Sequence, residues 1–226
     1  MDIRQLLAAV DHTVLDPDAD WQAIKRACDE AVRYGTASVC IPPSYVARAS
    51  EYVDGATHIC TVIGFPNGYN TEQTKIFETR DAVRNGADEI DMVINIGRLK
   101  SADTLYVLDE IRAVRAACEG RILKVIVETC LLTETEKSAV CELVACSGAD
   151  YIKTSTGFSH RGATKEDVAA FVRISAGRIR VKAAGGIRTL KDAEDFLRLG
   201  ASRLGTSRIV GIVKNDAALD ALFDKK

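Results

Sequence analysis

Two lysines and an aspartate stand inside short apolar runs of this sequence, where a charged side chain is costly to bury. They are Lys153, Lys182 and Asp91. Because side chains alternate between the two faces of a strand, the apolar neighbours Ile152 and Val181 turn both lysines to the opposite face. If the runs are strands of one closed sheet, the two ammonium groups and the carboxylate converge on a single interior.

Converging lysines favour one kind of chemistry, the attack of a neutral amine on a carbonyl. An isolated lysine is almost fully protonated at neutral pH and attacks poorly. A second ammonium about 5 Å away, at an effective dielectric of about 20, repels it by roughly 3 kcal/mol and favours the neutral amine. One lysine is then a Schiff-base nucleophile, and Asp91 moves protons on and off the carbon that becomes the enamine.

The same lysines also have a purely structural interpretation. A buried lysine can simply neutralise carboxylates such as Glu89 and Asp91, and a single inward lysine would favour that interpretation. Two inward lysines with apolar neighbours and an inward aspartate favour catalysis instead, because burying these charges without a function costs free energy.

Glycine and hydroxyl residues follow the same runs at positions 154–157, 185–188 and 205–208. Barrels of alternating strands and helices often bind phosphate after strands seven and eight, through backbone N–H groups and a helix N-terminus. Glycine lets the backbone approach the anion closely. These positions therefore predict an anion site. In the first apolar run, at 10–15, the same alternation of side chains turns Asp11 and Thr13 to the inner face of the closed sheet.

Eight apolar runs alternate with amphipathic stretches, which predicts a parallel sheet covered by helices. The expected strands are Val10–Leu15, Ser38–Ile41, His58–Ile63, Glu89–Ile94, Ile122–Glu128, Tyr151–Thr154, Arg180–Ala184 and Arg203–Gly205. The expected helices are Trp21–Tyr34, Thr71–Asn85, Ala102–Cys118, Thr133–Cys146, Thr164–Ile174 and Leu190–Leu199, with a weaker helical pattern over 43–50. Thr133 and Glu136 have the spacing of a capping box.

Two architectures compete for this pattern, a closed barrel and an open doubly wound sheet. An open doubly wound sheet that binds a dinucleotide should carry the motif GxGxxG after its first strand, and that motif is absent from this sequence. Eight units in 226 residues without a composition shift favour closure. We therefore predict a single (β/α)8 TIM-barrel catalytic domain over 1–226, with a short N-terminal helix that covers the barrel floor.

Composition excludes several classes of partner. The net charge of −2 and the 47% apolar, 27% charged composition offer no basic field for nucleic acid, and no apolar run approaches the ~20 residues of a membrane span. The seven cysteines form no CxxC pair, so they are expected to be reduced, in a cytoplasmic protein. His12, His58 and His160 lack metal-ligand spacing, so no metal site is expected.

Two long segments resemble the deoxyribose-phosphate aldolase family. They are DYIKTSTGF at 150–158 and VKAAGGIR at 181–188. Supporting segments in the family's order lie at 11–15, 64–68, 87–97 and 124–129, so that the resemblance covers nearly the whole chain.

The resemblance implies a class I aldolase that reversibly cleaves 2-deoxy-D-ribose 5-phosphate to D-glyceraldehyde 3-phosphate and acetaldehyde. It implies that Lys153 forms the Schiff base, that Lys182 perturbs it and that Asp91 belongs to the proton relay. It also implies a homo-oligomer and no metal or organic cofactor. Together, residues and resemblance give a predicted substrate- and phosphate-binding set of Gly157, Gly185, Gly186, Gly205, Ser207, Asp11, Thr13 and Thr154.

The chain departs from the family pattern near the predicted anion site. Arg161 follows His160 where many relatives have a small glycine-rich turn, and Arg208 stands where many have serine. We therefore expect Arg161 or Arg208 to add a charge-assisted phosphate contact. Two rival functions stay open at this point: a Schiff-base lyase with a keto donor, and a non-catalytic barrel that binds a sugar phosphate.

Overall fold

The computed structural model describes residues 1–224, and residues 225 and 226 of the predicted domain lie outside this range. In the described residues, eight parallel strands form a closed barrel in chain order, with the first strand paired to the last. They are β1 (Val10–Thr13), β2 (Ser38–Ile41), β3 (Ile59–Ile63), β4 (Glu89–Val93), β5 (Ile122–Ile126), β6 (Tyr151–Lys153), β7 (Arg180–Ala184) and β8 (Arg203–Thr206). This confirms the predicted TIM barrel.

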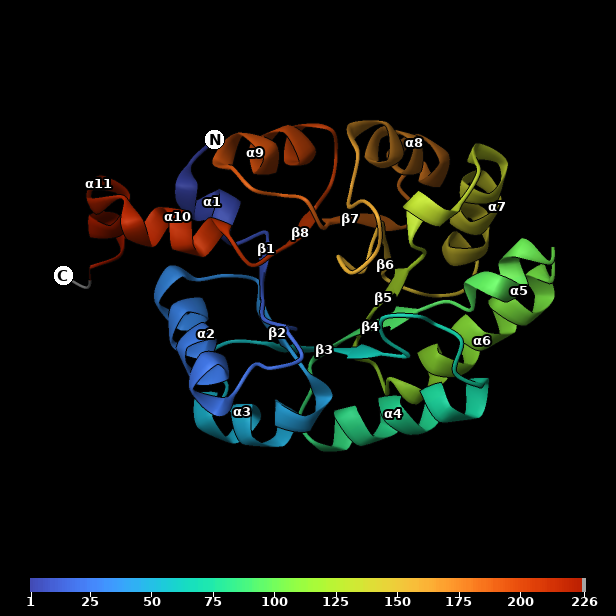
Figure 1. Cartoon of the computed structure of the whole chain (residues 1–226), viewed down its shortest axis with the longest axis horizontal. Helices are drawn as coiled ribbons and strands as arrows, with labels where there is room; N and C mark the ends of the chain where they lie inside the picture. The colour runs from blue at the N-terminus through green and yellow to red at the C-terminus, as the bar shows by residue number, and fades with distance from the viewer. Residues whose placement is uncertain (225–226) are drawn as a thin grey trace.

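Helices surround the strands on all sides in the view of Figure 1. They are α1 (Ile3–Leu7), α2 (Trp21–Tyr34), α3 (Val46–Val53), α4 (Glu72–Arg84), α5 (Ile96–Lys100), α6 (Thr104–Ala117), α7 (Glu134–Ala145), α8 (Lys165–Ser175), α9 (Leu190–Arg198), α10 (Ile209–Asn215) and α11 (Ala217–Asp220). Among the described residues, no helix combines the length and the apolar character that crossing a membrane requires.

Most expected elements are present, with bounds that differ by one or two residues. Thr133 caps α7 in the predicted capping box with Glu136. The fifth strand ends at Ile126 rather than at the expected Glu128, because Glu128 takes a left-handed conformation (φ 52°) and leads into a short 3-10 helix. The helix α5 was not predicted, although Asn95 caps it through its side chain.

The barrel separates two kinds of interior. Outward strand side chains such as Ile90, Met92, Ile152 and Val181 are buried in one apolar core shared with the helices. The inward face of the same strands carries charged side chains. The predicted alternation of side chains, with Ile152 outward and Lys153 inward, is therefore observed in β6.

A buried ion pair fixes the end of β4. The ammonium group of Lys75 on α4 lies 2.7 Å from Oε1 of Glu110 on α6, and both side chains are fully buried. Lys75 also donates to the carbonyl of Val93 at 2.8 Å, while Glu110 accepts from the backbone N–H of Asn95 at 2.9 Å. The pair thereby holds the strand that carries Asp91.

We predict that Lys75→Met lowers the free energy of unfolding by about 3–5 kcal/mol, because it leaves the Glu110 carboxylate buried without a cation. Urea unfolding followed by circular dichroism measures the change. The double variant Lys75→Met/Glu110→Leu should recover much of the loss. Lys165→Met, which removes an exposed pair with Asp195, serves as the control and should cost less than about 1 kcal/mol. A Lys75→Met protein as stable as the wild type would contradict this role.

Candidate active site

Asp91 lies at the centre of a buried charge cluster inside the barrel. Its Oδ2 accepts from the ammonium groups of Lys153 on β6 at 2.8 Å and Lys182 on β7 at 2.6 Å. Its Oδ1 accepts from Lys124 on β5 at 2.7 Å. Neighbouring parallel strands place Asp91 opposite Lys124, and Lys153 opposite Lys182. One carboxylate therefore holds three ammonium groups.

A second layer of carboxylates completes the cluster. Asp11 on β1 accepts from Lys182, and its Oδ1 lies 2.6 Å from Nη1 of Arg203 on β8. Glu89 lies 3.0 Å from Arg203 and 2.6 Å from Lys124. The first, fourth, fifth, seventh and eighth strands thus meet through ion pairs at the barrel axis.

The cluster controls the protonation of its members. Burial alone would raise the pKa of Asp91, but Lys124, Lys153 and Lys182 outweigh it and hold that pKa well below its usual range. Burial would likewise lower the pKa of Lys182, yet Asp11 and Asp91 raise it above its usual value. Lys182 therefore remains an ammonium beside Lys153 at neutral pH.

The buried cluster contains more cations than carboxylates. The cations Lys124, Lys153, Lys182 and Arg203 face the carboxylates of Asp11, Glu89 and Asp91. Four positive charges against three negative ones leave a surplus of one. This surplus places each ammonium group of the cluster close to other positive charges.

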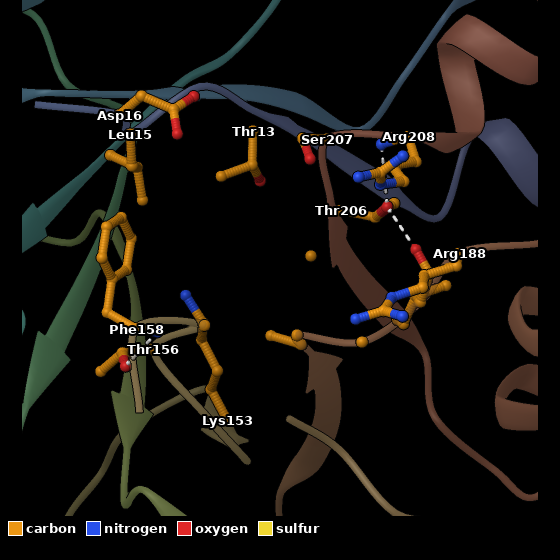
Figure 2. Close-up of a pocket in the computed structure, with 16 residues that line it drawn as sticks. Thr13, Leu15, Asp16, Lys153, Thr156, Phe158, Arg188, Thr206, Ser207 and Arg208 are labelled. Atoms are coloured by element: carbon orange, nitrogen blue, oxygen red, sulfur yellow. Dashed lines mark hydrogen bonds between the residues drawn. The ribbon is translucent and has the colours of Figure 1, made fainter. Parts of the chain in front are cut away.

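A pocket of about 310 Å³ opens above the cluster at the carboxyl ends of the strands. Among the residues that the structure describes, Lys153 is the only lysine that lines it. Figure 2 shows its ammonium group between two differing sides, with Leu15 and Phe158 on one and Arg188 and Arg208 on the other. The pocket lining is Thr13, Leu15, Asp16, Lys153, Thr156, Gly157, Phe158, Ala184, Gly185, Gly186, Ile187, Arg188, Gly205, Thr206, Ser207 and Arg208.

The loops after β6 and β7 have a backbone suited to an anion. Gly157, Gly185 and Gly186 all have positive φ, between 77° and 91°. A Cβ atom on Gly162 would lie 2.2 Å from the carbonyl of Gly185, so the loops after β6 and β7 touch through their backbones. Glycine is required here because the two loops approach more closely than any side chain permits.

The structure places the predicted site residues at two depths. Thr13, Gly157, Gly185, Gly186, Gly205 and Ser207 line the pocket, together with Lys153. Asp91, Lys182, Asp11 and Thr154 are fully buried and do not line it. Asp11 holds Lys182 and Arg203, and the Thr154 hydroxyl accepts from the backbone N–H of Ala184 at 3.1 Å. Their geometry is that of supports beneath the pocket. Of the two arginines expected near phosphate, Arg208 lines the pocket and Arg161 does not.

Sequence reasoning missed Lys124, Arg203 and Arg188. The alternation argument would have found Lys124, because its neighbours Leu123 and Val125 belong to the outer apolar core. Arg188 stands in a segment that the sequence analysis singled out, but no property of the sequence aims its guanidinium at the pocket. His12, next to Asp11, points the other way and lies 2.9 Å from Glu30 on α2.

Two groups of side chains in the described residues have oxygen or sulfur atoms close enough to share a metal ion. Their carboxylates, however, already contact lysine or arginine, so an added cation would meet repulsion. The groups are Cys40, Cys60, Asp91 and Asp11, Cys60, Glu89.

Comparison with known proteins agrees with this geometry. The model of the DeoC/LacD family aldolases matches residues 5–207. The chain belongs to the DeoC/LacD aldolase family. It is 57% identical over 217 residues to a deoxyribose-phosphate aldolase of Streptococcus pyogenes, which covers 96% of this chain and 97% of the relative. It is also 57% identical over 223 residues to one of Streptococcus agalactiae, covering 99% and 100%.

A solved structure supports the fold assignment. The deoxyribose phosphate aldolase of Aeropyrum pernix, described as a unique tetramer, superposes with a TM-score of 0.87 at 28% identity and covers 95% of this chain and 93% of its own. Family membership confirms the resemblance found in the sequence, and this chain is an aldolase.

We predict that Asp11→Asn destabilises the fold most at neutral pH and less in acid. Desolvation would raise the pKa of Asp11, but Lys124, Lys182 and Arg203 lower it. Stability from a lowered carboxyl pKa is present above the unfolded value and is lost as pH falls towards the folded one. The difference from wild type should therefore shrink by about 1.4 kcal/mol per pH unit below about 3.9. Urea unfolding between pH 5 and 2.5 measures it, and a constant difference would contradict the pairing.

Proposed function

We propose that this aldolase reversibly cleaves 2-deoxy-D-ribose 5-phosphate to D-glyceraldehyde 3-phosphate and acetaldehyde, through a Schiff base on Lys153. One observation carries the proposal. Among the described residues, Lys153 is the lysine that lines the pocket, and its amine lies 2.8 Å from the Asp91 carboxylate, which also accepts from Lys182. The names of the Streptococcus relatives support the substrate.

Lys153 acts as the nucleophile because its amine lines the pocket and shares the Asp91 carboxylate with the ammonium group of Lys182. Its amine adds to the C1 aldehyde of the open-chain sugar, and loss of water leaves an iminium. Lys182 stays charged because Asp11 and Asp91 raise its pKa. Its ammonium opposes a second positive charge nearby, which is the role expected for it from the sequence.

Asp91 is the group best placed to move protons. The C3 hydroxyl loses its proton as the C2–C3 bond breaks, and the electron pair of that bond passes to the iminium to form an enamine. C2 then takes up a proton, and water hydrolyses the imine to release acetaldehyde. Asp91 contacts the Lys153 amine directly, so it serves these transfers directly or through water.

The other end of the pocket is proposed to hold the phosphate. Backbone N–H groups of the glycine loops after β6, β7 and β8 and the hydroxyl of Ser207 supply neutral donors. Arg188 and Arg208 add positive charge on the same side, as Figure 2 shows. Asp11 and Thr154 are proposed to act through the groups that they support, rather than by touching substrate.

The two rival functions explain less of the site. A keto-donor lyase needs polar groups for the extra substituent of its donor, whereas the side of the pocket away from the arginines carries Leu15 and Phe158 beside Asp16. The Thr156 hydroxyl on that side is already bonded to Glu128. A barrel that only binds sugar phosphate has no reason to bury three lysines on one aspartate.

Two further properties of the enzyme, its assembly and its compartment, are also proposed. We infer a homo-oligomer, since the Aeropyrum pernix relative is described as tetrameric; light scattering tests it. The cytoplasm remains the proposed compartment, and residues 1–226 as one catalytic domain remain a prediction.

Borohydride reduction in the presence of acetaldehyde should add about 28 Da, one ethyl group, to the wild-type chain, because hydride reduces the imine on Lys153 to a stable amine. Intact-mass spectrometry measures the adduct. Lys153→Ala should form none, and Lys182→Ala should form it more slowly. Lys214→Ala, an exposed lysine paired with Glu30, is the control and should react like wild type. A folded wild-type protein without adduct would overturn the proposed mechanism.

Arg208→Ala should raise the KM for 2-deoxyribose 5-phosphate by about 10-fold, the loss of one charge-assisted hydrogen bond. The KM for unphosphorylated 2-deoxyribose should stay unchanged, because that sugar has no anion to contact. Steady-state kinetics on both sugars measure the contrast. Arg161→Ala is the matched control, since Arg161 lies outside the pocket lining. An equal effect of Arg208→Ala on both sugars would rule out a phosphate contact.

A further inference from the structure

Leu15 and Phe158 line the pocket on the side opposite the arginines, where Asp16 and Thr156 also lie, and Phe65 contacts Phe158 without lining the pocket itself. Leu15 follows β1, Phe65 follows β3 and Phe158 follows β6. The rings of Phe65 and Phe158 meet edge to face, with centroids 5.3 Å apart and planes at 86°. Leu15 and Phe65 pack on the buried residues Cys40, Cys60 and Val62. We call Leu15, Phe65 and Phe158 the apolar wall.

The wall lies where one substituent of the donor must point. The imine carbon on Lys153 is trigonal and carries the lysine nitrogen, the rest of the sugar and one further group. If the phosphate lies on the arginine side, the sugar chain leaves Lys153 in that direction (Figure 2). The third group then points to the opposite side, where Leu15 and Phe158 lie. In an aldehyde this group is hydrogen, and in a ketone it is a carbon.

Space for a larger group exists, but Leu15 separates it from the Lys153 pocket. A second cavity of about 180 Å³ adjoins Leu15 and Phe65, and its remaining lining is Pro42, Pro43, Val62, Gly64 and Glu78. Leu15 lines both this cavity and the pocket that contains Lys153. Removing the Leu15 side chain would therefore join the two spaces next to the reacting carbon.

We infer that the apolar wall, with Leu15 as its key residue, selects aldehyde donors over ketone donors. This inference rests on the proposed Schiff base at Lys153. The wall excludes a carbon substituent by its shape. Leu15, Phe65 and Phe158 are thus specificity-determining residues, while the catalytic groups are the same for either donor.

The ketone reaction needs no additional reactant. Acetone forms the imine with loss of water, loses a methyl proton to become the enamine, and attacks the aldehyde carbon of glyceraldehyde 3-phosphate. The new C–C bond turns that aldehyde into a hydroxyl, which gains a proton, and water hydrolyses the imine. The sum is one acetone and one glyceraldehyde 3-phosphate joined in a single product.

The test compares kcat/KM for acetone and acetaldehyde, with glyceraldehyde 3-phosphate as acceptor, in wild type, Leu15→Ala and Phe158→Ala. A single methyl group in an apolar pocket is commonly worth 10-fold or more in kcat/KM. Leu15→Ala should therefore raise the ratio of acetone to acetaldehyde by about 10-fold. Leu105→Ala is the matched control, because Leu105 lies on α6 and is 73% exposed; its ratio should equal that of wild type.

The outcomes separate the two hypotheses. A wild-type protein that cannot join acetaldehyde to glyceraldehyde 3-phosphate would overturn the proposed function itself. If wild type does so, while folded Leu15→Ala and Phe158→Ala both keep the wild-type ratio, the apolar wall does not select the donor. Circular dichroism checks folding, and Phe158, which is 49% exposed, decides the question if Leu15→Ala is unfolded.

Discussion

The sharing of one buried carboxylate by three lysines is the interaction on which the rest of this structure depends. Asp91 holds Lys124, Lys153 and Lys182 within 2.6–2.8 Å. Without Asp91 the three ammonium groups would repel one another inside the barrel, and without the ammonium groups its carboxylate would be desolvated and unpaired. The closed barrel makes this arrangement possible, because it aims side chains from separate strands at one axis.

The three lysines of the cluster differ in their access to solvent. Lys124 and Lys182 are fully buried and held by two or more carboxylates, whereas Lys153 has one carboxylate partner in the described residues and lines the pocket. The more constrained lysines keep their protons, because neighbouring carboxylates raise their pKa, and their charge is the fixed environment of Lys153. Preorganised charge of this kind needs no rearrangement during the reaction.

Much of the fold and part of the site follow from local patterns in the sequence. Alternation within a strand determines which face a side chain takes, and it placed Lys153, Lys182 and Asp91 correctly on the inner face of the barrel. It does not determine depth along the barrel axis, so Asp11 and Thr154 could not be told from residues that reach the pocket. The ion pairs of Arg203 with Asp11 and Glu89 depend on the register of strands far apart in the chain. The direction of a long arginine such as Arg188 depends on its surroundings in the folded loop.

The pairing of β1 with β8 joins the first and last strands of the barrel at the centre of the enzyme. Asp11 is synthesised well before its partners Lys182 and Arg203, which are 171 and 192 positions later. During synthesis a nearly complete chain still has Asp11 without its cations and an open sheet edge on either side of the gap. The charge cluster is therefore complete only once β8 has been synthesised. A chain truncated before β8 lacks both the last strand of the barrel and the guanidinium of Arg203 that pairs with Asp11 on the first strand.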